Sequence, residues 1–130
     1  MFTKLAIALF AASAVIAAPT SSKRDGQFSG KATYYAVGLG ACGNTNSDSE
    51  MVVALNADQY GSIASGLSSA CGKTVTITNT QNGNQATATV VDKCPGCALG
   101  SLDMSPTLFG KLSNDNLGQG VFPISWDFSD

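Results

Sequence analysis

Four cysteines constrain this chain more than any other feature of the sequence. They stand at Cys42, Cys71, Cys94 and Cys97 in a chain of 130 residues. A small domain buries a modest core and benefits from covalent crosslinks. In an oxidising compartment an even number of cysteines indicates disulfides rather than free thiols, so we expect two of them.

The N-terminal sequence predicts that the chain enters the secretory pathway and so an oxidising compartment. A lysine at position 4 precedes an apolar run that ends in small residues, which is typical of a secretory signal peptide and too short for a membrane span. We expect a signal peptide at 1–17, a short propeptide or linker at 18–27 containing Lys23-Arg24, and one domain at 28–130. The mature protein is expected to be secreted and extracellular, in the cell wall.

The charge of the expected mature chain restricts its partners. From Asp25 onward there are four lysines and no arginine against nine acidic residues, which leaves a net charge near −5. The positive charges are scattered, so neither nucleic acid nor an anionic membrane surface is an expected partner. A neutral polymer or a small neutral ligand fits this balance better.

The pattern along the chain predicts short strands and little helix. Strand-like composition or alternation occurs at 28–37, 51–56, 73–80, 85–92 and 121–128, and Asn82-Gly83 favours a hairpin turn. Pro123 suggests an edge strand or a bulge, and Trp126 is expected in the core. Residues 57–62 suggest a single helical turn and residues 105–113 a short helix, with Ser105 as its cap and Pro106 at its first position. About six short strands in so small a domain close most easily into a barrel.

The Cys94-Pro95-Gly96-Cys97 segment allows three interpretations. A zinc site would need four nitrogen or sulfur ligands, and the chain has no histidine and no second Cys-x-x-Cys. Thioredoxin-like chemistry would need a βαβ pattern and a helix beginning at the first cysteine. The simplest interpretation is a local Cys94–Cys97 disulfide that clamps a turn, which leaves Cys42 to pair with Cys71. The other pairings remain open at this point.

Two acids flank this turn and are the candidate chemical groups. Asp92 ends an expected strand and Asp103 precedes the expected helix. Alone, each has a plain structural explanation, because aspartate initiates turns and favours helix N-termini. If Asp103 is partly removed from water, its pKa rises and it can donate a hydrogen bond or a proton.

Five segments, in order, carry a resemblance to a known family: GKATYYAVGLGACG, MVVALN, ACGKTVTI, ATVVDKCPGC and LDMSPTLF. Together they resemble the double-psi β-barrel of expansins, barwin-like proteins and rare-lipoprotein-A-like proteins, and most of all the fungal single-domain loosenins. Some relatives of that group carry the label riboflavin-aldehyde-forming enzyme. The resemblance implies an all-β, six-stranded double-psi β-barrel with one or two short helices.

The same resemblance implies a site in an open groove. Its strand motif matches Thr33, Tyr34 and Tyr35, and its two acids match Asp92 and Asp103. In the related family 45 endoglucanases an acid at the latter position is the proton donor. Strand alternation sends the two tyrosines to opposite faces, and we expect Tyr35 in the groove because it has the parity of Thr33. For Tyr34, sugar contact and core packing are equally expected roles.

These observations lead to three hypotheses for function. The first is a monomeric, secreted protein that binds and loosens polysaccharide such as cellulose or chitin without hydrolysis, with no cofactor and no metal. The second is a glycoside hydrolase or lytic transglycosylase that uses Asp103 as its acid. The third is a barwin-like module that binds protein, such as a protease inhibitor or an effector.

Overall fold

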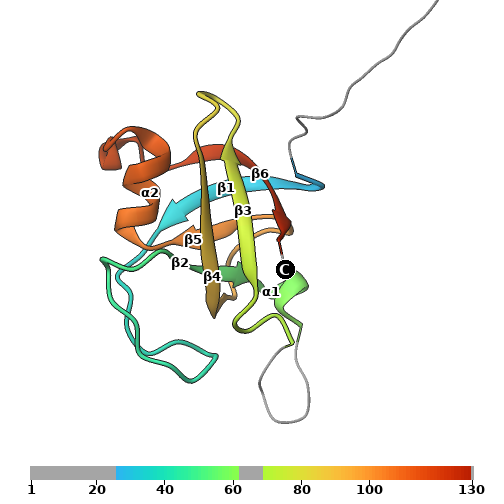
Figure 1. Cartoon of the computed structure of the whole chain (residues 1–130). Coiled ribbons are helices and arrows are strands. Elements are labelled where there is room, and N and C mark those ends of the chain that lie inside the picture. Colours follow the sequence, from blue (N-terminus) through green and yellow to red (C-terminus); the bar gives the residue numbers. More distant parts are fainter. Residues whose placement is uncertain (1–25, 62–68, 130) are drawn as a thin grey trace, which may run out of the picture.

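A closed barrel of short strands forms the body of the protein (Figure 1). The computed structural model describes residues 26–61 and 69–129, so the expected signal peptide and nearly all of the expected linker lie outside the described residues. The strands follow one another around the barrel in the order β1-β5-β2-β4-β3-β6. Their bounds are β1 Phe28–Tyr34, β2 Val52–Asn56, β3 Thr74–Asn79, β4 Gln85–Cys94, β5 Leu102–Met104 and β6 Phe122–Phe128.

The barrel mixes parallel and antiparallel pairs. β1 pairs in parallel with β5, and β2 pairs in parallel with β4, whereas the other four neighbouring pairs are antiparallel. Parallel neighbours cannot be joined by a tight hairpin, and here other strands lie between the members of each parallel pair along the chain. The six-stranded barrel with short helices that the sequence predicted is confirmed.

Alternating side chains build the core. In β3 the buried positions alternate with half-buried ones, so Val75 and Ile77 point inward. Trp126 is fully buried as expected, with its ring 4.8 Å from that of Phe28 and 5.2 Å from that of Phe128. Its indole nitrogen donates to the carbonyl of Gly100 at 2.8 Å, which satisfies the polar atom of a buried ring.

Helix α2, Pro106–Ser113, lies against one end of the barrel (Figure 1). The Ser105 hydroxyl accepts from the amide of Leu108 at 3.2 Å, which is the predicted N-cap. On its buried side, Phe109 lies between two barrel rings, 4.7 Å from Phe122 and 4.8 Å from Tyr34. The helix therefore closes the apolar interior at this end.

The predicted β3–β4 hairpin is tied to that helix. Its turn contains Gly83 with a φ of 81°, a conformation that glycine adopts without strain. Three side-chain amides from the hairpin, those of Asn79, Asn82 and Asn84, donate to the carbonyl of Leu112 near the end of α2. These bonds supply partners for a carbonyl that the end of the helix leaves free.

Three local features differ from the sequence expectations. The strand β5 was not predicted, because Leu102-Asp103-Met104 is too short to display alternation. The interpretation of Pro123 as part of an edge strand is wrong, because β6 is paired with β1 on one side and with β3 on the other. A 3₁₀ turn at Leu117–Gln119 was also not anticipated, whereas the single turn of α1 at Ala57–Tyr60 was.

Candidate functional site

A row of four side chains crosses neighbouring strands on the outside of the barrel. Thr33 of β1 is in register with Asp103 of β5, and Asp103 is in register with Ala54 of β2. Ala54 is in turn in register with Asp92 of β4. Residues directly opposite one another on adjacent strands share a face of the sheet. The row Thr33–Asp103–Ala54–Asp92 therefore forms one continuous band.

The band faces outward because the residues beside it face the core. Leu102 and Met104 flank Asp103 and are fully buried, whereas Asp103 is half-buried. Adjacent strands lie about 4.8 Å apart, so the Cα atoms of the two aspartates, with one strand between them, are separated by roughly 10 Å. Ala54 between the two acids is buried, so the accessible part of the band consists of the half-buried side chains of Thr33, Asp103 and Asp92.

Asp103 has the environment of a partly desolvated acid. Its Oδ1 atom accepts from the Thr33 hydroxyl at 2.8 Å. Burial raises the pKa of Asp103 above its ordinary value, the Thr33 hydrogen bond acts against this rise, and the charge of Asp92 adds to it. Asp103 thus keeps its proton to a higher pH than an exposed aspartate does.

Asp92 is held by backbone groups. Its Oδ1 atom accepts from the amide of Ala41 at 2.7 Å and from the amide of Lys93 at 2.8 Å. The first of these bonds joins β4 to the long loop between β1 and β2, which projects from the barrel in Figure 1. Asp92 therefore anchors a loop, a role that the sequence analysis did not foresee.

The two tyrosines separate as strand alternation predicts. Tyr35 is half-buried, and burial together with the charges of Asp92, Asp103 and Asp48 raises its pKa to about 12. Its phenol therefore stays protonated and can donate a hydrogen bond beside the acids. Tyr34 packs on Phe109 of α2 and is 39% exposed. The structure thus brings Tyr35, and not Tyr34, to the acidic band.

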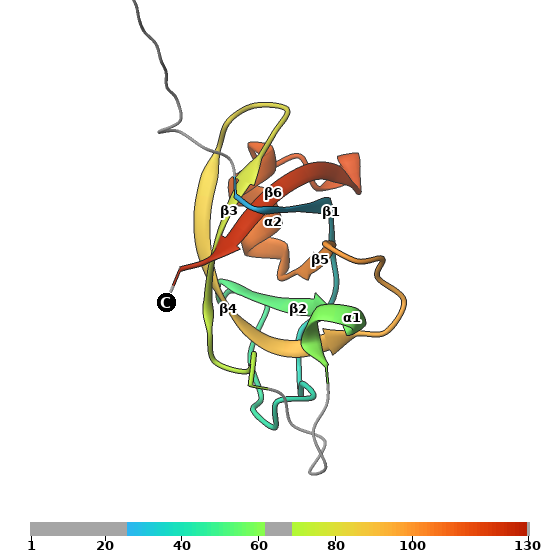
Figure 2. The same ribbon diagram turned by 90° about the vertical axis from the view of Figure 1, so that its right-hand side faces the viewer.

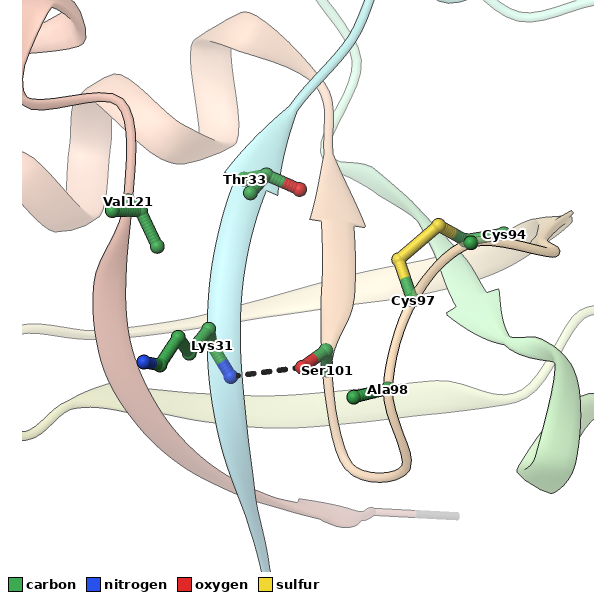
Figure 3. Close-up of a pocket in the computed structure, with 8 residues that line it drawn as sticks. Lys31, Thr33, Cys94, Cys97, Ala98, Ser101 and Val121 are labelled. Carbon is green, nitrogen blue, oxygen red and sulfur yellow. Dashed lines mark hydrogen bonds between the residues drawn. A yellow bond between two sulfur atoms is a disulfide. The ribbon is translucent and has the colours of Figure 1, made fainter.

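A pocket continues the band beyond Thr33. It has a volume of about 320 Å³, and Figure 3 shows Lys31 and Thr33 of β1 on its floor. Its sides come from Val121, Ala98, Ser101 and the Cys94–Cys97 disulfide. Sequence reasoning missed Lys31 and Ser101, although Lys31 lies two residues before Thr33 and so shares its face.

Two close approaches position this pocket. The turn that ends at Gly100 packs directly on β1, and a Cβ atom on Gly30 would overlap the Gly100 carbonyl. Gly100 itself has a φ of 86°, which other residues adopt only with strain. The Ser101 hydroxyl accepts from the amide of Lys31 at 3.1 Å, so the pocket side is joined to its floor.

Both disulfides lie near the band. Cys94, the last residue of β4, pairs with Cys97 in the segment between β4 and β5, which Figure 2 shows as a loop projecting beside α1. Cys42 pairs with Cys71, which joins the loop carrying Ala41 to the segment before β3. Within residues 26–61 and 69–129, no group of three or more acids or cysteines is placed to hold a metal ion. No helix in this described part is long and apolar enough to span a membrane.

Comparison with known proteins assigns the fold. The mixed six-stranded barrel is a double-psi β-barrel of the kind found in expansins. The chain belongs to the Barwin family, whose family model matches residues 54–130.

Among curated proteins, the chain is 43% identical over 106 residues to allergen Asp f 7 of Aspergillus fumigatus. This match covers 77% of the chain but 36% of that allergen, so the chain spans about a third of this relative's length.

Two solved structures extend the comparison. The Streptomyces papain inhibitor is 30% identical with a TM-score of 0.65, and the match covers 79% of this chain and 99% of the inhibitor. A Clavibacter michiganensis expansin variant in complex with cellohexaose is 28% identical with a TM-score of 0.65. That match covers 79% of this chain and 50% of the expansin.

Proposed function

We propose that this protein is secreted and binds a cell-wall polysaccharide along the band from Thr33 to Asp92, loosening contacts between glycan chains without cleaving them. The observation that carries this proposal is the register of Thr33, Asp103, Ala54 and Asp92 across four strands. The expansin neighbour was solved with cellohexaose, which supports a glycan as the ligand class. The two disulfides fit a secreted protein.

Each group in the band has a part in this proposal. Protonated Asp103 donates a hydrogen bond to a hydroxyl or glycosidic oxygen, and burial favours this form because it raises the pKa of the carboxyl group. The Tyr35 phenol donates a second hydrogen bond. Asp92 accepts hydrogen bonds from sugar hydroxyls while its Oδ1 atom holds the loop.

Loosening requires no bond cleavage. A hydrogen bond between two glycan chains contributes only about 0.5–1.5 kcal/mol net, because water competes for the same groups. A protein that replaces several such bonds at one place lets the chains slide.

The test is retention on insoluble cellulose, chitin and peptidoglycan. We compare wild type with Asp103→Ala, and we use Asp58→Ala as the control because Asp58 is an exposed acid on α1, outside the band. We expect retention of the wild type and the control on at least one glycan and about tenfold weaker retention of Asp103→Ala, the size of one hydrogen bond to a charged or strongly polar group.

Each result decides something. Equal retention of wild type and Asp103→Ala removes Asp103 from the proposal, and no retention of the wild type on any glycan ends it. Mass spectrometry of the supernatant detects cleaved oligosaccharides. Their appearance with wild type and not with Asp103→Asn, which keeps a donor but cannot deliver a proton, assigns the protein to the hydrolases or lytic transglycosylases.

A second candidate function is inhibition of a papain-like protease. The match covers 99% of the papain inhibitor and 79% of this chain, so the whole inhibitor corresponds to the barrel. The test is residual papain activity with increasing amounts of this protein. Inhibition that is unchanged in Asp103→Ala favours this candidate over glycan binding.

A further inference from the structure

The pocket beyond Thr33 differs in chemistry from the acidic band that it continues. The pKa of Tyr35 is raised by burial, by the two carboxylates of the band and by Asp48 outside it, whereas none of the described residues that line the pocket carries a carboxylate. The ionisable group in the pocket is the ammonium of Lys31. A glycan chain lying along the band therefore passes from carboxyl groups into a place that offers a cationic donor.

The rest of the pocket is mainly apolar. Val121 is 44% exposed, and the Ala98 methyl group and the Cys94–Cys97 disulfide face it across the floor (Figure 3). The polar groups beside these surfaces are the Lys31 ammonium and the hydroxyls of Ser101 and Thr33. The Ser101 oxygen accepts from the Lys31 amide, so its own hydrogen remains available to a ligand.

Ring stacking does not explain such a pocket. No aromatic residue is among the described residues that line it, and Trp126 is fully buried in the core. An unsubstituted glucose unit would thus find no stacking platform and would leave the apolar wall without a matching group. A volume of about 320 Å³ is near the lower end for small-molecule sites, which suits a single sugar unit with its substituent.

A polyanionic glycan does not fit either. It would meet Lys31 favourably, but its neighbouring units would lie over Asp103 and Asp92 in a protein whose expected mature form has a net charge near −5. The substituent that matches the pocket is neutral, has a carbonyl acceptor for the ammonium, and has a methyl group for the wall.

We propose that this pocket is a subsite for the acetamido group of an N-acetylated sugar unit, so that the protein prefers N-acetylated glycan chains to unsubstituted glucan. The carbonyl oxygen accepts from the Lys31 ammonium, and the methyl group lies against Val121 on the same side of the pocket (Figure 3). This inference rests on the proposed function, because it assumes that a glycan lies along the band.

The experiment compares two soluble probes by isothermal titration calorimetry, chitohexaose and cellohexaose. Lys31→Met keeps the apolar stem of the side chain and removes its donor. Lys111→Met is the matched control, because Lys111 is exposed on α2, away from the pocket. Val121→Ser makes the wall polar. Thermal unfolding of each variant checks that the barrel is intact.

We expect wild type and Lys111→Met to bind chitohexaose about tenfold more tightly than cellohexaose, as one charge-assisted hydrogen bond allows. Lys31→Met is expected to lose this preference through weaker chitohexaose binding alone. Val121→Ser is expected to weaken chitohexaose binding by about threefold, since a methyl group loses its apolar contact.

The outcomes separate this inference from the proposed function. Equal affinity of the wild type for the two hexaoses, with binding that Asp103→Ala weakens, overturns the acetamido subsite and leaves the proposed function standing. A Lys31→Met variant that keeps the preference, or loses affinity equally for both probes, also overturns the subsite. Absence of binding to either hexaose overturns the subsite, whereas the proposed function is overturned only if the protein is also not retained on cellulose, chitin or peptidoglycan.

Discussion

Asp103 and Asp92 lie on opposite sides of Ala54 and are held in different ways. Asp103 receives one hydrogen bond, from the hydroxyl of Thr33, and burial raises its pKa. Asp92 receives two hydrogen bonds from backbone amides, one of them in the loop that carries Cys42. Asp103 is thus hydrogen-bonded to a side chain that can exchange partners, whereas Asp92 is hydrogen-bonded to backbone amides.

This difference teaches that two acids in one row need not share a role. Replacing the acceptor of a loop amide leaves a fixed backbone N–H without its partner. Replacing the acceptor of a threonine hydroxyl leaves a group that can rotate toward water. We therefore expect changes on the Asp92 side to appear in stability and changes on the Asp103 side to appear in binding and pH dependence.

The largest expected effect is on the Asp92 side. Replacing both Cys42 and Cys71 with serine removes a crosslink between residues 29 apart in sequence, which on the chain-entropy estimate costs about 3.5 kcal/mol of unfolding free energy. Replacing Cys94 and Cys97, only 3 apart, costs about 2 kcal/mol on the same estimate. Urea unfolding measures both. An equal loss for the two pairs would mean that loop closure is not what distinguishes them.

Asp92→Ala is expected to cause the next largest loss of stability. The amide of Ala41 loses its acceptor, and the free energy of unfolding should fall by about 1–2 kcal/mol. Asp92→Asn keeps an oxygen at the Oδ1 position and should recover most of this loss. Asp103→Ala should change stability far less. If Asp103→Ala proved the more destabilising in chemical denaturation, the contrast between the two acids would be reversed.

Asp103→Asn should have a small effect of predictable sign. Because the folded-state pKa of Asp103 is raised, its protonated form contributes stability that is fully present below the unfolded pKa of about 3.9 and is lost as pH rises through the folded-state value. The side-chain amide introduced by Asp103→Asn does not titrate, so the variant loses no stability as pH rises. The variant should therefore unfold at a slightly higher temperature than wild type at pH 7, with no difference near pH 3. A constant difference across this range would contradict the assignment.

Glycan binding should depend on pH in the same direction as stability. If protonated Asp103 is the donor, glycan retention by the wild type should increase as pH falls through the pKa of Asp103, and Asp103→Asn should give a flat profile. A wild-type profile that is itself flat between pH 7 and pH 4 would remove the donor role.

Thr33→Val should produce the smallest change. It removes the hydrogen bond that lowers the pKa of Asp103, so that pKa should rise further. Carbon-detected NMR titration of the carboxyl group measures it. Thr87→Val is the control, because Thr87 is exposed on β4 and lies outside the band. A downward shift in Thr33→Val would show that the hydroxyl does not stabilise the ionised form.

Much of the barrel could be predicted because its signals are local. The alternation in β3 and β4, the Asn82-Gly83 turn and the Ser105 cap each depend on a few adjacent residues. Tyr35 could be placed with Thr33 by parity alone.

The acidic band could not be derived in the same way. It exists because β5, with three residues, lies between β1 and β2, and neither its presence nor its register leaves a local pattern. The loop-anchoring role of Asp92 depends on Ala41, which is 51 residues away in sequence. The edge-strand prediction from Pro123 was wrong because β6 is paired on both sides, which is uncommon for a strand that contains proline.

The position of β6 has a consequence for biogenesis. This final strand is the one that joins β1 to β3, so a nascent chain that still lacks residues 122–128 cannot close the cylinder. The first strand must wait for a partner made almost a hundred residues later, and such distant pairing is slow. Closure of the barrel therefore depends on the strand that is synthesised last among those described.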